Sequence, residues 1–240
     1  ATDVAFNLYP VTGTRISVYK VRVYKTETLR VVEDKTEDDY GPGSYVYPQA
    51  TVYNPDTESY EQVFVDGCFD ITKVEIGYSP AVLIVKVFLR ELKNPGWNSE
   101  TNFDVQKIDV YIDTDDEASG STILLTGRNA VFQAKDSWNW VAVADGWYRG
   151  LLDSSLSEYD AVVAYGDEDR NLICIAIDLS YLGNPTKDQV KNWDILVAMM
   201  GHGDQYSQVD YGYVRTVKES TADWEFGGGD DGESDSNIID

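Results

Sequence analysis

A tight turn flanked by carboxylates is the feature of the sequence with the clearest chemistry. It runs from Glu37 to Pro48, and in it Asp38 and Asp39 stand directly before Tyr-Gly-Pro-Gly. A turn of this kind gathers carboxylate and carbonyl oxygens around one point, which suits the six to eight oxygen ligands of Ca²⁺. Asp70 would complete the shell if its strand lies alongside. A solvated acidic turn without an ion is the alternative interpretation.

Two more acidic clusters are candidate calcium ligands. Asp113, Asp115 and Asp116 leave a predicted strand and enter a loop with oxygen ligands at alternating positions, without the glycine and terminal glutamate of an EF-hand loop. A charged hairpin end is the alternative there. Asp230 and Asp231 lie in the Gly-rich acidic tail, for which a solvated tail is the favoured interpretation.

Groups suited to catalysis are few. His202 is the single histidine, so a site with several histidine ligands is excluded, and its place between Gly201 and Gly203 indicates an exposed loop. Asp109 and Asp113 share one face of a predicted strand, as in some sandwich glycosidases. Four residues along a strand span about 13 Å, too far for the roughly 5 to 5.5 Å between the carboxyl groups of a retaining site. We therefore predict that the chain is not an enzyme.

Aromatic residues in loops are candidates for binding sugar rings, because an aromatic face matches the apolar C–H surface of a pyranose. Most of the tryptophans and tyrosines are expected in the core. Trp97 in Asn-Pro-Gly-Trp-Asn, and Trp147 with Tyr148 after Gly146, lie at predicted loops. These three side chains are the candidate carbohydrate-binding residues.

The elements that would position these residues are strands. Ile16 to Lys25 and Val105 to Ile112 alternate with period two, and three mostly apolar segments indicate buried strands: Val82 to Leu89, Leu172 to Ile177 and Ile195 to Met200. Turn signals separate them. We expect an all-β, antiparallel β-sandwich of the jelly-roll or immunoglobulin-like kind. One short helix is possible near 186–193, where Thr186 and Gln189 suggest a capping box.

Charge and length narrow the possible partners. The net charge of −23 would repel nucleic acid and anionic lipid, and bound divalent cations would relieve the self-repulsion. No run of the sequence approaches the roughly 20 apolar residues of a membrane span, so no membrane insertion is expected. Cys68 and Cys174 allow one bridge or two free thiols. We expect one domain, secreted or at the cell surface.

Several spaced motifs resemble the C-terminal module of glucodextranase, which also occurs on archaeal amylopullulanases. They are Asp38 to Pro48, Cys68 to Glu75, Leu92 to Pro95, Ile108 to Asp113, Gly127 to Ala130, Asp145 to Trp147, Trp224 to Gly229 and Asn237 to Asp240. The resemblance implies a DOMON-like β-sandwich that is a non-catalytic, carbohydrate-binding or cell-surface appendage. It also implies a calcium-binding turn at Asp38 and Asp39, with Asp70 a weaker candidate, and a structured tail.

The segment before this module is the main departure from the family. Residues 1–34 form a strand-rich N-terminal extension and residues 35–240 the module. Our leading hypothesis is a calcium-binding module that attaches to polysaccharide or to a cell-envelope glycan. The alternative is a self-assembling subunit of an extracellular filament or surface layer, in which the N-terminal strand joins a neighbour's sheet and calcium bridges the subunits. Pairing of that strand within its own chain is the favoured interpretation of this segment.

Overall fold

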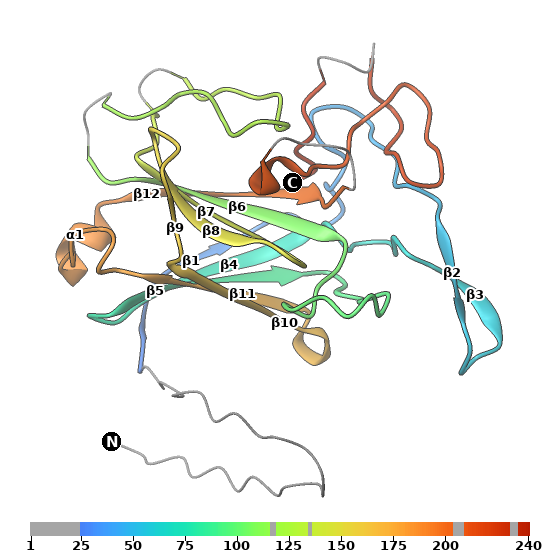
Figure 1. The fold of residues 1–240 in the computed structure, drawn as a ribbon, viewed down its shortest axis with the longest axis horizontal. Helices are drawn as coiled ribbons and strands as arrows, with labels where there is room; N and C mark the ends of the chain where they lie inside the picture. Colours follow the sequence, from blue (N-terminus) through green and yellow to red (C-terminus); the bar gives the residue numbers. More distant parts are fainter. Residues whose placement is uncertain (1–24, 116–118, 134–135, 204–208, 231–234) are drawn as a thin grey trace, which may run out of the picture.

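Two antiparallel sheets lie face to face in the computed structural model of the chain (Figure 1), which confirms the predicted β-sandwich. The structure describes residues 25–115, 119–133, 136–203, 209–230 and 235–240. The strands expected before residue 25 therefore lie outside the described residues. No helix in the described ranges has the length and apolar character needed to cross a membrane.

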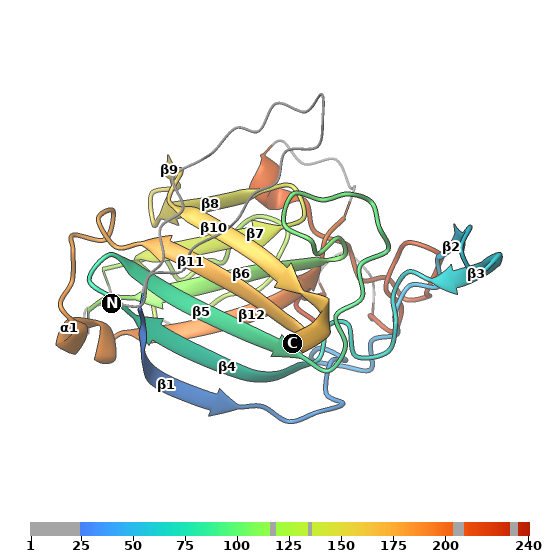
Figure 2. The same cartoon turned by 90° about the horizontal axis from the view of Figure 1, so that it is seen from below.

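The first sheet has the strand order β1-β4-β5-β11-β10. These strands are β1 (Glu27–Glu33), β4 (Ile71–Tyr78), β5 (Val82–Leu89), β11 (Leu172–Asp178) and β10 (Val162–Asp167). Strands β5 and β11 lie in the middle and are the most apolar, as their sequences predict, whereas β1 and β10 form the edges (Figure 2). Strand β1 falls within the range expected for the N-terminal extension, and it pairs with β4.

The second sheet has the order β12-β6-β7-β8-β9. Its strands are β12 (Asp194–Gly201), β6 (Gln106–Asp113), β7 (Trp140–Asp145), β8 (Arg149–Asp153) and β9 (Glu158–Tyr159). Residues that alternate along β6 face opposite sides. Ile108, Val110 and Ile112 pack into the main core between the sheets, while Tyr111 belongs to a second apolar cluster.

That second cluster covers the outer face of the second sheet. Leu124, Leu125 and Trp138 from the long β6–β7 connection, with Tyr211, pack on Tyr111, Val141 and Val143. Because loops cover this face, β6 is buried on both sides, including its charged residues Lys107 and Asp109. Alternate side chains of β6 therefore point into two different buried clusters.

The smaller elements lie around the sandwich. Strands β2 (Thr51–Asn54) and β3 (Ser59–Gln62) form a hairpin that projects away from both sheets in Figures 1 and 2. The expected helix is present as α1 (Lys187–Lys191), with the capping box between Thr186 and Gln189. Two short 3₁₀ helices occupy Glu168–Arg170 and Asp210–Gly212. Cys68 and Cys174 are both free thiols.

The C-terminal residues are packed against the sandwich. The Asn237 side chain accepts a hydrogen bond from the backbone N–H of Val217 (2.8 Å) and donates one to the carbonyl of Gly127 (2.7 Å). Ile239 is 1% exposed, and its N–H donates to the carbonyl of Met199 in β12 (2.8 Å). Residues 235–240 are thus held as an integral part of the fold.

Candidate metal centre

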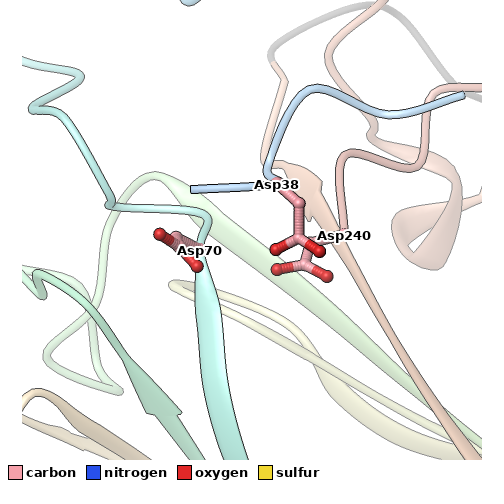
Figure 3. A group of neighbouring side chains, drawn as sticks. All are labelled: Asp38, Asp70 and Asp240. Carbon is pink, nitrogen blue, oxygen red and sulfur yellow. The ribbon is translucent and has the colours of Figure 1, made fainter. Parts of the chain in front are cut away.

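Three carboxylates from distant parts of the chain converge at one end of the sandwich. Asp38 lies in the turn after β1, Asp70 directly precedes β4, and Asp240 lies beside β12 (Figure 3). One oxygen from each lies within 4.8 Å of the others. Two of the three, Asp38 and Asp70, were predicted ligands, and within the described ranges no second group of three ligating side chains gathers in this way.

Backbone hydrogen bonds hold the three segments together. The N–H of Glu37 donates to Asp70 Oδ2 (2.8 Å), and the N–H of Ile71 donates to Asp240 Oδ2 (2.6 Å). The N–H of Gly41 donates to the carbonyl of Ile239 (2.9 Å). Gly41 has a φ of +58°, and a Cβ there would lie 2.3 Å from the ring of Tyr45. The turn thus needs glycine at this position to approach the tail so closely.

Several carboxylate oxygens in the cluster and on the adjacent Asp39 are buried without a hydrogen-bond partner. They are Asp38 Oδ1, Asp39 Oδ2 and Asp70 Oδ1. Asp70 is fully buried, and its other oxygen, Oδ2, lies 2.7 Å from Arg90 Nε, which balances one negative charge. A buried carboxylate oxygen that binds neither a proton nor a cation costs free energy. The arrangement therefore has more negative charge than its own basic residues neutralise.

The pKa values of two carboxyls reflect this imbalance. Burial, together with the charge of Asp70, raises the pKa of Asp39 to about 6. Burial raises the pKa of Asp240 to about 7, with the charges of Asp34, Asp38 and Asp70 adding to the effect. Both carboxyls would be ionised more readily if a cation lay among them.

An open hollow of about 1010 Å³ lies beside the cluster. It is lined by Glu37, Asp39, Tyr45, Tyr47, Phe64 and Arg90, among others. The hollow reaches Asp39 and Arg90, whereas Asp38, Asp70 and Asp240 are not among the residues that line it.

Three other predicted calcium ligands, Asp113, Asp115 and Asp230, lie elsewhere in the structure. Asp113 ends β6, where it pairs with Asp194, and its Oδ1 accepts the N–H of Asp115 (3.2 Å). Asp115 also accepts from the hydroxyl of Ser119. Asp230 is exposed, and its N–H donates to Asp235 Oδ2 (2.9 Å). Asp116 and Asp231 lie outside the described residues. The structure does not bring Asp113, Asp115 or Asp230 to the Asp38 cluster.

Asp240 is the member of the cluster that sequence reasoning missed. No metal-ligand spacing in the sequence marks it, because it meets Asp38 and Asp70 through tertiary contacts, among them the hydrogen bond from the N–H of Ile239 to the carbonyl of Met199. The apolar pair Ile238-Ile239 at the end of an acidic tail was the available signal, since such a pair is expected to pack against the fold.

The Asp109 side chain, considered above for catalysis, is committed to a buried ion pair. Arg128 Nε and Nη2 donate to its two oxygens at 2.7 Å each, and the Tyr111 hydroxyl donates to Oδ2 at 2.7 Å. Asp109 and Arg128 are both fully buried. This fork-shaped pair ties the β6–β7 connection to the sheet, which is a structural role.

The three predicted sugar-binding aromatics have different surroundings. Trp97 is partly buried, with its ring 5.9 Å from that of Trp224. Trp147 is 45% exposed, and its ring lies 4.8 Å from the His202 ring. Tyr148 is half-buried beside Tyr211. Of the three, Trp147 offers the most accessible aromatic surface.

Comparison with known families identifies one match. The model of the C-terminal binding module, SLH-like, of glucodextranase matches residues 29–240. The match covers the sandwich from β1 to the tail, including Asp38, Asp70 and Asp240. No curated protein matches the chain.

Proposed function

Because the chain belongs to the family of C-terminal, SLH-like binding modules of glucodextranase, we propose that it is a calcium-stabilised, non-catalytic module that attaches to carbohydrate or to the cell envelope outside the cell. Family membership supports the binding role. The convergence of Asp38, Asp70 and Asp240, with buried oxygens lacking partners, is the observation that supports the calcium.

Calcium suits this donor set because it is a hard cation that takes oxygen ligands in flexible geometry. Asp38, Asp70 and Asp240 each supply one oxygen, and the unpartnered Oδ2 of Asp39 is the nearest further donor in sequence. The ion would neutralise the excess negative charge. It would also fix the turn and the tail against β4.

The attachment is tested by co-sedimentation of the whole chain with insoluble polysaccharides and with purified cell-envelope fragments, in calcium and in chelator. We expect the protein to sediment with at least one glycan-bearing fraction in calcium, without release of reducing sugar. Failure to sediment with any polysaccharide or envelope fraction, or release of sugar from any of the substrates, would contradict the proposal.

One observation favours a second candidate function, self-association by strand addition. Strand β1 is hydrogen-bonded to β4 on one side and forms the edge of the first sheet, with Val31 49% and Val32 50% exposed. An edge strand with exposed valines can accept a strand from another chain. The N-terminal segment proposed to supply that strand lies outside the described residues.

Size-exclusion chromatography with light scattering, with and without calcium, tests this second function. We expect calcium-dependent oligomers that Val32→Lys reduces. Val131→Lys is the control, because Val131 is 72% exposed in the β6–β7 connection and the charge change is the same. A monomer under every condition excludes the strand-addition hypothesis.

A further inference from the structure

A second hollow, of about 440 Å³, lies next to the loop between β7 and β8. We call it the Trp147 pocket, and it is lined by Asp145, Trp147, Tyr148, His202, Asp210 and Tyr213. Its volume falls within the range of small-molecule sites, about 300–1,000 Å³. Three of these side chains are aromatic rings and a fourth is an imidazole, so the walls are largely flat and apolar.

A buried carboxylate fixes the position of Trp147. Asp145 Oδ1 accepts the backbone N–H groups of Trp147 (2.8 Å) and Tyr148 (2.7 Å), while Oδ2 accepts from Lys107 Nζ (2.5 Å). Asp145 and Lys107 are fully buried. Burial alone would raise the pKa of Asp145, but His202 and the charge of Lys107 hold it well below its usual range. The loop that carries Trp147 is thus anchored to an ionised group.

His202 supports the other side of the tryptophan. Its ring lies 4.8 Å from the Trp147 ring at an angle of 42°, and its Nδ1 lies 3.3 Å from Asp145 Oδ2. The neighbouring Gly203 allows the chain to pass close to the segment at Val214 and Arg215, because a Cβ there would lie 2.7 Å from the backbone nitrogen of Arg215. The imidazole therefore contacts the indole at a tilt, and Trp147 remains 45% exposed.

The charges around the pocket select the kind of occupant. Asp210 is exposed at the rim, Lys107 is neutralised by Asp145, and the chain carries a net charge of −23. An anionic sugar would be repelled. An uncharged pyranose combines an apolar C–H face for Trp147 and Tyr213 with hydroxyls that can donate to Asp210.

We propose that the Trp147 pocket binds a neutral pyranose residue of a glycan chain. The proposal rests on the glycan attachment proposed above and assigns that attachment to one place on the module. Trp147 is the stacking surface, Tyr213 the second aromatic wall, and Asp145 a positioning residue that acts through the loop.

The test is calorimetric titration of the whole chain in calcium with maltoheptaose, cellohexaose and a charged oligogalacturonate. We expect wild-type protein to bind at least one neutral oligosaccharide and to bind the oligogalacturonate more weakly. Trp147→Ala and Tyr213→Ala should each weaken the neutral ligand about tenfold, the upper end of what an aromatic contact contributes. Circular dichroism melts establish that each variant is folded.

Trp224→Ala is the matched control, because Trp224 is 44% exposed and lies outside the pocket. Its affinity should equal that of wild-type protein. If wild-type protein binds but Trp147→Ala binds equally well, or Trp224→Ala is the variant that loses binding, the pocket assignment is wrong and glycan attachment stands. If wild-type protein binds none of these oligosaccharides, the pocket assignment is overturned, while the co-sedimentation assay still decides attachment.

Discussion

Replacing Asp38 with asparagine should change stability in opposite directions without and with calcium. Without the ion, the ligand oxygens of Asp38, Asp70 and Asp240 lie within 4.8 Å of one another. At an effective dielectric constant of about 20, one such pair of charges repels by about 3.5 kcal/mol. A proton bound to Asp240, whose pKa is raised to about 7, removes part of this repulsion. In chelator, Asp38→Asn should therefore be neutral or stabilising.

With calcium, we expect the wild-type protein to gain the free energy of binding at the proposed site and the variant to lose most of it. A concentration one hundred times the dissociation constant stabilises the folded state by about 2.7 kcal/mol. For a chain of 240 residues that corresponds to a rise in melting temperature of roughly 5–11 °C. The same calcium series should move the melting temperature of Asp38→Asn by a small fraction of this.

The assay is differential scanning calorimetry across a calcium series, starting in chelator. Asp169→Asn is the control, since Asp169 is exposed and the substitution removes the same charge. It should respond to calcium as wild-type protein does. An equal calcium response of Asp38→Asn and wild-type protein would refute the assignment, as would an equal loss of stability in chelator and in calcium.

Three other predictions concern stability. Lys107→Met leaves Asp145 buried without its cation. Denaturant titration should show a free energy of unfolding lower by about 3–5 kcal/mol. A loss under about 1 kcal/mol would contradict the buried ion pair. Gly203→Ala places a methyl group against the backbone of Arg215 and should cost about 1–3 kcal/mol, whereas an unchanged melting temperature would show that the close approach is absent. In chelator, the pKa of Asp39 is about 6, above the ordinary aspartate value of 3.8, so the folded state binds this proton more tightly than the unfolded state. Its destabilising effect therefore develops as pH rises through this window, so Asp39→Asn should exceed wild-type protein in melting temperature at about pH 8 and match it at about pH 4; a constant difference would contradict the pKa.

Much of the sandwich could be predicted because its signals are local. Leu172 to Ile177 and Ile195 to Met200 are apolar segments of strand length bounded by turns, and each lies within a strand. Thr186 and Gln189 stand three residues apart, so the capping box depends on neighbours in sequence. The alternation of polar and apolar residues could not show that loops cover the second sheet. Asp109 on an alternating strand gives the same sequence pattern whether it faces water or Arg128.

The candidate metal centre was predicted in part for the same reason. Asp38 and Asp39 stand in a turn whose glycines and carboxylates are contiguous, so a local motif marks them. Asp240 joins them from 202 residues away through the pairing of Ile239 with Met199. Tertiary contacts of that sequence separation leave no periodic pattern to detect.

The adjacency of the Asp38 turn and the Asp240 segment also determines how the module would carry a mechanical load. Force applied between these two segments acts first on the hydrogen bond from Gly41 to Ile239 and on the contacts among the carboxylates. The strands of both sheets lie outside that direct path. Under such a load, the contacts between the Asp38 turn and the Asp240 segment would break first. A divalent cation bound among the carboxylates would raise the force needed to break them.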